Sequence, residues 1–428
     1  MQPKKAFSSQ LLRRITRWNA VHVLAKTFSA FCAAKWYALF LGPMGMAHLG
    51  NFRNLLAEWE VLVTLGLENS LIQSLSKPEL TDHDRSRLLS TCLALIGATG
   101  VLVLAGSALG WHWMESAVLH NAPVNTYFWI CCLSLLPFYW AQLYLGMVLN
   151  GLGQTISYFK AASWGSIINL MLTYVLVSRF GLSGAMLSLI AYPVFLLTWY
   201  LYVLKKMHAF RFFTFQSIEL TSLKPLLTVS AMSILAAIWN PIIQWYIRDQ
   251  LMIFQGLEVA GYWEALSRIS SFLFLFVGSV TTYYFLPLLV RGKSNRERNI
   301  AFRRFYFRLF PLFLAGLVIL WLGRSLWVPF LFSDAFDPIE SAMTWQFAGD
   351  GLRAASLIWG YLFFAEKRWK SFLVFELASG LLWMYTSNIG IENQGLQGAL
   401  KAYTFTYFIY GIAVCLYFTY TARITQKD

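Results

Sequence analysis

The sequence predicts an all-α integral membrane protein with twelve transmembrane helices in two parallel six-helix lobes around a central cleft. Three observations lead to this fold class. Hydrophobic residues make up 58% of the 428 residues and charged residues only 13%, more apolar surface than a soluble core of this size can bury. The apolar residues gather in runs long enough to cross a bilayer. Two sequence patterns also recur half a chain apart, which indicates an internal repeat.

Twelve segments meet the requirement of about 20 mainly apolar residues for one crossing. The connections between them are short, so we expect no inserted soluble domain. The eighth segment is too long for one straight span. In order, the predicted spans are residues 18–42, 47–73, 88–110, 124–150, 155–178, 182–204, 225–247, 251–288, 309–331, 342–366, 371–389 and 395–421.

The distribution of positive charge predicts the topology. If the N-terminus is cytoplasmic, the opposite loops contain only three cations, which are Arg179, Arg248 and Arg324. The cytoplasmic segments then hold most of the 34 Lys and Arg residues, including Lys4, Lys5, Lys77, Lys293 and Lys427. The positive-inside rule therefore places both termini in the cytoplasm. Because the net charge of +14 follows membrane topology, we expect no nucleic-acid partner.

The two recurring patterns share one offset, which is half the length of the chain. Gly42 opens "GPMGMAHLGNFRNLL" and Gly256 opens "GLEVAGYWEALSRI"; Gly181 and Gly395 open similar Gly-Leu-x-Gly-Ala segments at the same half-chain offset. Six spans is an even number, so both copies enter the membrane in the same orientation. We therefore expect lobes at residues 1–210 and 211–428. The alternative is chance, because Gly-Leu-x-Gly-Ala is a common packing pattern in membrane helices.

Ionisable residues inside the spans are costly and therefore candidates for function. Lys160 lies near a span end, where it is expected to snorkel. The remaining cations are Lys26, Lys35, Arg53, Arg268, Arg353 and Lys401, and the candidate polar or coupling residues are Asn51, Asn54, Glu58, Glu264 and Asp350. A cavity with surplus positive charge suits an anionic group, above all phosphate, for which Arg offers bidentate donors.

Helical spacing gives these residues an expected arrangement. Five polar residues of span 47–73 share one helical face, which should line a cavity or a lobe interface: Asn51, Asn54, Glu58, Asn69 and Gln73. Arg53 and Glu60 lie on another face of the same span. Glu264 and Arg268 are four residues apart, and Asp350 and Arg353 are three apart, so each pair can form an ion pair. The alternative is that these pairs only neutralise each other and join helices.

Several site types are missing from the sequence. It contains no phosphate-binding loop, no metal-ligand cluster and no nucleophile-base pattern, so we expect no cofactor, no metal site and no enzymatic activity. A membrane-embedded glycosyltransferase or polysaccharide polymerase is the alternative from another class. Such enzymes usually carry a large catalytic loop, whereas the longest loop opposite the cytoplasm, residues 111–123, is short.

Four segments resemble the Wzx-type polysaccharide flippases of the multidrug/oligosaccharidyl-lipid/polysaccharide exporter (MOP) superfamily, most closely the branch for O-antigen and enterobacterial common antigen. They are "LGPMGMAHLGNFRNL" (41–55), "YWEALSRISSFLFLFVGSVTTYYFLPLL" (262–289), "WQFAGDGLRAASLIWGYLFFAEK" (345–367) and "GLQGALKAYTFTYFIY" (395–410). Glu264 and Arg268 depart from the family pattern, in which Gln and a small polar residue are familiar. The resemblance spans nearly the whole chain.

The resemblance implies a MATE-like transporter of the bacterial inner membrane. Its substrate would be an undecaprenyl-diphosphate-linked oligosaccharide, turned from the cytoplasmic to the periplasmic leaflet by alternating access. Polysaccharide polymerase and chain-length proteins are the implied partners, besides membrane lipids. A carboxylate could couple transport to an ion gradient, with Glu58, Asp350 and Glu264 as candidates in that order. The alternative within the superfamily is a multidrug antiporter, for which a cavity dominated by acids would be expected.

Overall fold

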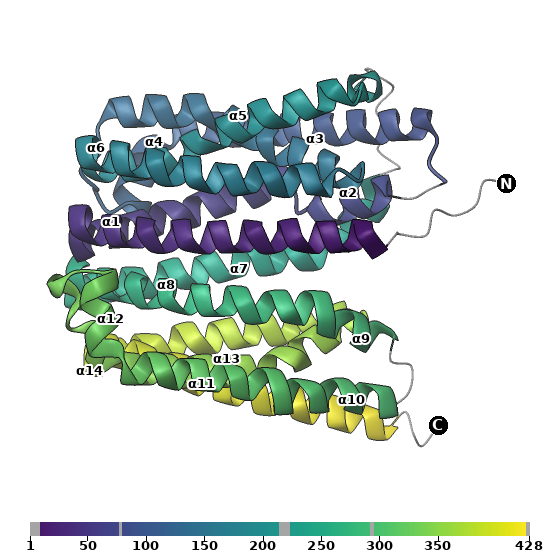
Figure 1. Ribbon diagram of the computed structural model, residues 1–428. Coiled ribbons are helices and arrows are strands. Elements are labelled where there is room, and N and C mark those ends of the chain that lie inside the picture. The colour runs from purple at the N-terminus through teal and green to yellow at the C-terminus, as the bar shows by residue number, and fades with distance from the viewer. Residues whose placement is uncertain (1–8, 77–78, 214–222, 292–294, 425–428) are drawn as a thin grey trace. The chain divides into compact units, whose positions relative to one another are not determined.

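The computed structural model describes residues 9–76, 79–213, 223–291 and 295–424, and within these ranges the regular structure is helical throughout (Figure 1). The cations Lys4, Lys5, Lys77, Lys293 and Lys427, on which part of the topology prediction rests, lie outside the described residues. The all-α prediction is confirmed for the part of the chain that the structure describes.

The helices follow one another with short connections. They are α1 (Ser9–Thr64), α2 (Glu68–Leu75), α3 (Asp82–Leu109), α4 (Trp111–Trp113), α5 (Thr126–Gly151), α6 (Thr155–Lys206), α7 (Leu223–Gln255), α8 (Leu257–Val280), α9 (Leu286–Arg291), α10 (Asn295–Arg304), α11 (Phe310–Leu322), α12 (Arg324–Leu331), α13 (Ile339–Ala365) and α14 (Trp369–Ile424). Two π-helical segments, η4 (Thr281–Phe285) and η5 (Phe305–Leu309), join α8 to α9 and α10 to α11 without a break.

Three of these helices are pairs of helices that meet at a kink. Non-helical backbone at Gly42, Gly181 and Gly395 divides α1, α6 and α14. Counted in this way, the long helical segments of the described residues correspond to the twelve predicted spans. Six of the helices in this part of the chain are long and apolar enough to cross a membrane by length and composition.

The repeat that the sequence predicts recurs in the backbone. Gly181 has φ 53° and ψ −128°, and Gly395, at the half-chain offset, has φ 57° and ψ −133°. Positive φ is accessible to glycine at little cost because it has no Cβ. Each kink therefore reverses the chain between two spans with almost the same two dihedral angles.

The same packing contact follows each of these kinks. A Cβ on Gly184 would overlap the backbone carbonyl of Leu176, and a Cβ on Gly398 would overlap the carbonyl of Gly390. Both members of the second contact are the half-chain counterparts of the first. Small residues allow helices to approach this closely. The recurrence of a specific contact argues against chance as the source of the pattern.

Some predicted span boundaries were wrong. The second span, residues 47–73, is interrupted because Leu65 and Gly66 have φ values of 48° and 58°, and a new short helix, α2, begins at Glu68. Gly256, with φ 91°, separates residues 251–255, which end α7, from α8. Hydropathy alone places such breaks poorly because the flanking residues remain apolar on both sides.

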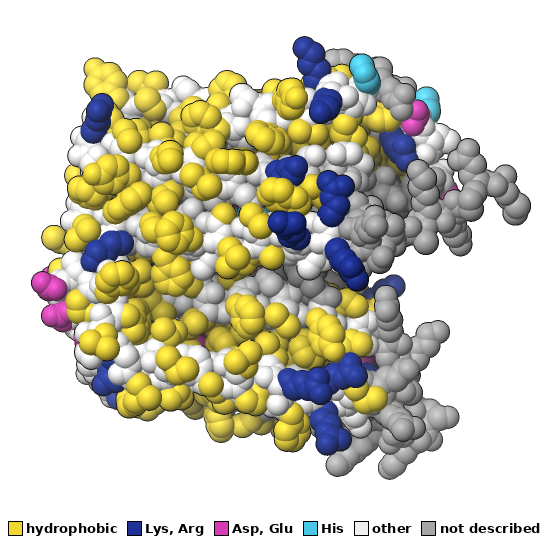
Figure 2. Space-filling view, viewed as in Figure 1, with side chains coloured by type: hydrophobic (Ala, Val, Ile, Leu, Met, Phe, Trp, Pro, Cys, Tyr) yellow, Lys and Arg dark blue, Asp and Glu magenta, His cyan; other side chains and the backbone are white. Residues whose placement is uncertain are grey.

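The chain divides into two compact units. The first comprises Met1–Leu41 and Asn51–Ile238, and the second comprises Gly42–Gly50 and Trp239–Asp428. The start of the second helical segment of α1 thus belongs with the second unit, and the chain returns to the first unit at Asn51. Figure 2 shows hydrophobic side chains over the flanks of the helices and Lys and Arg toward helix ends. Large exposed apolar side chains such as Leu102 and Phe330 are expected where the surrounding solvent is lipid.

Candidate functional site

A buried triad of charged side chains lies in the second unit. Glu264 of α8 contacts one guanidinium with each carboxylate oxygen: Arg248 Nη2 lies 2.6 Å from Oε2, and Arg268 Nε lies 2.6 Å from Oε1. The side chains of Arg248 and Glu264 are each 2% exposed, and that of Arg268 is 29% exposed. The predicted pairing of Glu264 with Arg268 is therefore confirmed. One carboxylate between two guanidiniums leaves the triad with surplus positive charge.

Arg248 is the member that the sequence prediction missed. We placed it in a loop opposite the cytoplasm, because a minimum-length span ends the seventh segment at residue 247. In the structure α7 continues to Gln255, and Arg248 is buried well before its end. The sequence did contain an indication of this. No Gly or Pro follows Arg248 before Gly256, which is compatible with a helix that continues beyond the apparent end of the span.

Gly50 fits directly against this triad. A Cβ at position 50 would overlap Glu264 Oε2 and would lie 3.0 Å from Cζ of Arg248. Nearby, a Cβ on Gly261 would overlap the backbone carbonyl of Pro43. All these residues belong to the second unit. The segment Gly42–Gly50 therefore packs against α8 at two glycines, and only a residue without a side chain fits beside the carboxylate.

Asp350 of α13 is the centre of a second polar cluster. Its Oδ2 accepts a hydrogen bond from Ser270 Oγ at 2.6 Å, and its Oδ1 accepts one from Tyr403 OH at 2.8 Å and a longer one from Gln346 Nε2 at 3.4 Å. Gln346 Nε2 also donates to Ser270 Oγ at 2.7 Å. Asp350 is fully buried. Since a buried carboxylate requires donors, these three side chains account for its presence here.

The predicted ion pair between Asp350 and Arg353 was wrong. Among the described residues the hydrogen-bond partners of Asp350 are the hydroxyls and the amide above, and Arg353 lies instead over two aromatic rings. Its Cζ is 4.4 Å from the centroid of Phe274 and 5.5 Å from that of Tyr407. Residues three apart on a helix can pair, but here the carboxylate is taken by α8 and α14, and the guanidinium gains cation–π contacts.

Aromatic rings connect the two clusters of the second unit. Trp263, adjacent to Glu264, has its ring centroid 6.2 Å from that of Trp383, which lies 5.0 Å from Tyr403. Tyr403 in turn donates a hydrogen bond from its hydroxyl to Asp350.

Lys401, on the same helix as Tyr403, lies 5.3 Å from the ring of Trp345 and donates a hydrogen bond to Gln394. The second unit thus holds the predicted cations Arg268, Arg353 and Lys401.

The first unit holds the other predicted residues. Arg53 lies with its Cζ 5.1 Å from the ring centroid of Tyr37. Glu60 accepts a hydrogen bond from Tyr139 OH at 2.9 Å. Lys160, expected to snorkel, lies 4.9 Å from the ring of Trp18. Each of these contacts places a charged side chain beside an aromatic side chain.

The remaining candidates of the first unit differ in burial. Asn51 is buried, whereas Lys35, Asn54 and Glu58 are half-buried and Lys26 is exposed. The expectation that one helical face joins Asn51 to Gln73 was wrong, because the break at Leu65 and Gly66 separates them, and Gln73 is exposed on α2. The side chain of Asn69, also assigned to that face, lies outside the described part of the structure.

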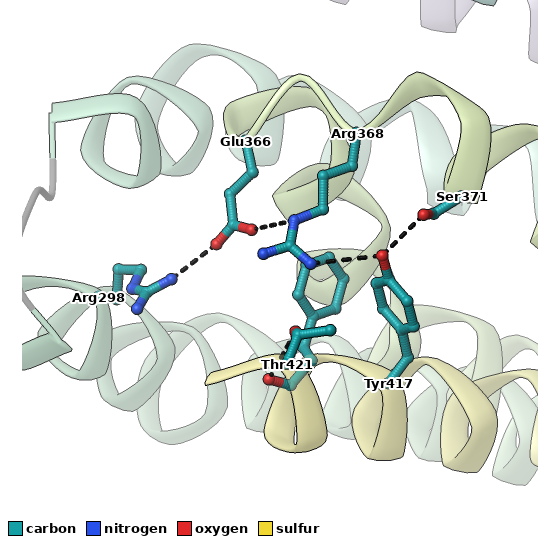
Figure 3. Close-up of polar contacts among 7 residues, drawn as sticks. Arg298, Glu366, Arg368, Ser371, Tyr417 and Thr421 are labelled. Carbon is teal, nitrogen blue, oxygen red and sulfur yellow. Dashed lines mark hydrogen bonds and ion pairs between the residues drawn. The ribbon is translucent and has the colours of Figure 1, made fainter. Parts of the chain in front are cut away.

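A third ionic network lies at the helix ends of the second unit (Figure 3). Glu366 is bound by Arg298 Nη1 and by Arg368 Nε, each at 2.6 Å. Arg368 Nη1 also donates to the Tyr417 hydroxyl at 3.3 Å, and Ser371 Oγ lies 2.7 Å from the same hydroxyl. This rim network joins α10, the connection between α13 and α14, and the end of α14. All its ionic side chains are partly exposed.

The described residues offer a metal ion no cluster of three or more His, Cys, Asp or Glu side chains. The chemistry that they do offer is anion binding and charge burial. Guanidinium groups can receive phosphate oxygens, and the buried carboxylates Glu264 and Asp350 are fixed by specific partners.

No protein-family model matches the chain. The lipid III flippases of Escherichia coli (strain K12) and Shigella flexneri are each 23% identical over 413 residues, covering 94% of this chain and 97% of the relative. Among solved structures, a multidrug resistance MATE family transporter of the MOP superfamily has a TM-score of 0.75 at 16% identity, covering 96% of this chain and 99% of that one.

A second solved structure, the lipid II flippase MurJ, has a TM-score of 0.70 at 13% identity and covers 95% of this chain and 87% of that one. These two structures are too distant in sequence to indicate more than architecture. Their near-complete coverage nevertheless settles the arrangement of helices along the chain. The chain has the multi-helix membrane fold of the MATE and MurJ transporters, as the sequence predicted.

Proposed function

We propose that this protein is a flippase that moves a lipid-linked oligosaccharide from the cytoplasmic to the periplasmic leaflet of the bacterial inner membrane. The observation that carries the proposal is the similarity to the lipid III flippases, which extends over 94% of the chain. The finer substrate assignment is an undecaprenyl-diphosphate-linked common-antigen or O-antigen unit, supported by the sequence resemblance. The relatives are named as flippases and transporters, which favours transport over catalysis.

The buried charges are compatible with this substrate. A headgroup with two phosphates and several sugars must cross about 30 Å of hydrocarbon, and membrane-embedded guanidiniums can replace part of its hydration. The triad around Glu264 supplies surplus positive charge. The same proposal includes alternating access between halves at residues 1–210 and 211–428. It also places both termini in the cytoplasm and includes polysaccharide polymerase or chain-length proteins as partners.

The proposal is tested by complementation. The chain is expressed in bacteria that lack their own O-antigen or common-antigen flippase, and surface glycan is measured by immunoblot with protein levels matched. The variants are Arg53→Ala, Arg268→Ala and Arg353→Ala. Lys160→Ala is the matched control, because it also removes a cation stacked on an aromatic ring but lies near a span end.

The expected result is glycan restored by the wild type and by Lys160→Ala, and reduced in the Arg variants. Restoration by all variants would leave the flippase function standing and remove the assigned cations from the substrate path. No restoration with any tested glycan, despite membrane insertion, would contradict the proposed substrate class.

Ion coupling is part of the proposal, and Glu58 and Asp350 are the proposed coupling residues. Glu264 is the weaker candidate, because both of its oxygens already hold guanidiniums. Transport into vesicles should stop when the pH gradient and membrane potential are collapsed. Transport that continues unchanged would contradict coupling without contradicting flipping.

A multidrug antiporter is the second candidate, favoured by the TM-score of 0.75 with the MATE family transporter. Expression in a drug-sensitive strain separates the two functions. Increased resistance to cationic drugs without restored glycan would favour the antiporter, whereas restored glycan at unchanged resistance would favour the flippase.

A further inference from the structure

The helix that runs from α10 through η5 into α11 has one buried face and one exposed face. The exposed face carries Arg303, Arg304 and Arg308 at its α10 end, followed by Leu312 and Ile319, which are 61% and 68% exposed. This face is therefore basic at one end and apolar over the rest. The buried face is apolar at a spacing of four residues: Ala301, Phe305, Leu309, Phe313 and Leu317.

The three arginines have no acidic neighbour along their own helix. No Asp or Glu occurs between Glu297 and Asp334, so none lies three or four residues from any of them, the spacing at which ion pairs form on a helix. The carboxylate of Glu366, in the rim network of the same unit, binds Arg298 and Arg368 instead. The exposed guanidiniums of α10 and η5 therefore present positive charge at the surface.

Aromatic side chains accompany this basic end. Phe307, between Arg304 and Arg308, is 77% exposed, and Arg304 Nη1 donates to the hydroxyl of Tyr284 in η4 at 3.1 Å. Figure 2 shows Lys and Arg side chains gathered at the end of the second unit where Figure 1 labels α10, and hydrophobic side chains over α11. Basic and aromatic side chains beside an apolar surface are typical of the boundary between headgroups and hydrocarbon.

The length of the helix gives the depth of the arginines in the bilayer. Arg308 and Arg324 are 16 positions apart, which corresponds to about 24 Å of helix, somewhat less than the hydrocarbon thickness of about 30 Å. Long Arg side chains at both ends can extend to the headgroups. Arg303 and Arg304 precede Arg308 by about one turn, so their guanidiniums lie at the depth of the lipid phosphates.

We propose that this face binds one anionic phospholipid, whose phosphate contacts Arg303, Arg304 and Arg308 and whose acyl chain lies along Leu312 and Ile319. The planar guanidinium matches phosphate oxygens, and basic clusters next to a membrane span attract acidic headgroups. The continuous apolar stripe favours a lipid over a free phosphate ester, which would contact only the basic end. With both termini in the cytoplasm, the site faces the cytoplasmic leaflet. The inference depends on the membrane fold and not on the transported substrate.

The test measures binding of the first lipid molecule to the purified full-length chain in detergent by native mass spectrometry. Phosphatidylglycerol is the anionic probe, and phosphatidylcholine with the same acyl chains is the neutral control. Arg303→Gln/Arg304→Gln/Arg308→Gln should weaken phosphatidylglycerol binding roughly 100-fold, about fivefold for each cation near an anionic headgroup. Phosphatidylcholine should bind more weakly than phosphatidylglycerol to the wild type and equally to both proteins.

The matched control is Lys205→Gln/Lys206→Gln/Lys370→Gln, which removes the same number of exposed cations from other helix ends. This variant should bind phosphatidylglycerol within about 3-fold of the wild type, half a tenfold step in free energy. An equal loss in both triple variants would assign the effect to net charge and overturn the site.

Single variants separate binding from folding. Arg303→Gln and Arg308→Gln change exposed side chains and should each weaken phosphatidylglycerol binding about fivefold at an unchanged melting temperature. An unchanged affinity in folded single variants and in the triple variant would overturn the inference. So would a wild type that binds phosphatidylglycerol no more tightly than phosphatidylcholine.

A soluble headgroup distinguishes a lipid from a free phosphate ester. Glycerophosphoglycerol carries the same phosphate without acyl chains, so it should not displace phosphatidylglycerol at equal concentration. Displacement at equal concentration would show that the apolar stripe contributes nothing and would overturn the lipid assignment.

Discussion

The second unit contains the same ionic arrangement at two depths. In the buried triad, Glu264 lies between two guanidiniums; in the rim network, Glu366 lies between the guanidiniums of Arg298 and Arg368 (Figure 3). All four distances are 2.6 Å. The difference is solvent: the carboxylate side chain is 2% exposed in the triad and 20% exposed at the rim.

This comparison shows that distance alone does not measure an ion pair. At the rim, water can replace either guanidinium, so each pair contributes little. In the triad, removing one partner leaves a charge that neither that partner nor water stabilises, so the free energy of unfolding falls strongly. This holds even where the intact ion pair stabilises the fold no more than apolar side chains of similar size would. Removing one partner from similar geometry should therefore cost little at the rim and much in the interior.

The largest effect is expected for Glu264→Ala. This change leaves Arg248 buried without the carboxylate that binds it, and the free energy of unfolding should fall by about 3–5 kcal/mol. The measurement is an SDS titration of the purified protein in mixed micelles, followed by circular dichroism. Equal losses for Glu264→Ala and for the rim change Glu366→Ala would contradict the comparison.

Asp350→Ala should have the next largest effect. It removes the acceptor shared by Ser270, Tyr403 and Gln346, and buried donors left unsatisfied cost about 1–3 kcal/mol. The same SDS titration measures the loss. Ser270→Ala is the matched control, because it removes only one donor and leaves the carboxylate with two others; a loss as large as that of Asp350→Ala would show that Asp350 is not the centre of the cluster.

Gly50→Ala sharpens the comparison by disturbing the triad without removing a charge. Overpacking costs roughly 1–3 kcal/mol, partly offset by the higher helix propensity of Ala, about 1 kcal/mol, so a net loss smaller than that of Asp350→Ala is expected. Gly97→Ala is the control, because no atom beyond the neighbouring residues and nearby backbone of its own helix lies within 4 Å of a Cβ there. That variant should be neutral or more stable. Melting temperatures in detergent compare the two, and indistinguishable values would contradict the close contact at Gly50.

The smallest effect is expected for Glu366→Ala at the rim. Its pairs are partly exposed, so the loss should be about 0.2–1 kcal/mol and should shrink further in high salt. Melting temperatures at low and high ionic strength measure this dependence. A loss that is large and insensitive to salt would place the rim network in the same class as the triad.

Local sequence patterns were sufficient for much of the fold. Composition and the length of the apolar segments predicted the helical membrane class, and the half-chain offset predicted a repeat that the structure shows in the kinks at Gly181 and Gly395. The ion pair of Glu264 with Arg268 was predictable because a spacing of four residues places both on one helix face. These inferences depend on residues that are close in sequence or on composition averaged over a span.

Partners distant in sequence could not be predicted. Ser270 and Tyr403 reach Asp350 from positions 80 and 53 residues away, and no helical periodicity relates those distances. Arg248 was missed because hydropathy sets a minimum span length and does not show how far a helix continues beyond it.

The sequence by itself determined the class of protein, the repeated order of helices and most of the charges that lie within spans, because bilayer thickness and helix geometry act on each segment separately. Only the tertiary structure decided which charge meets which partner. A buried carboxylate takes the donors that packing brings within hydrogen-bond distance. In the folded chain Glu264 contacts two guanidiniums beside a glycine, and Asp350 accepts hydrogen bonds from two hydroxyls and an amide.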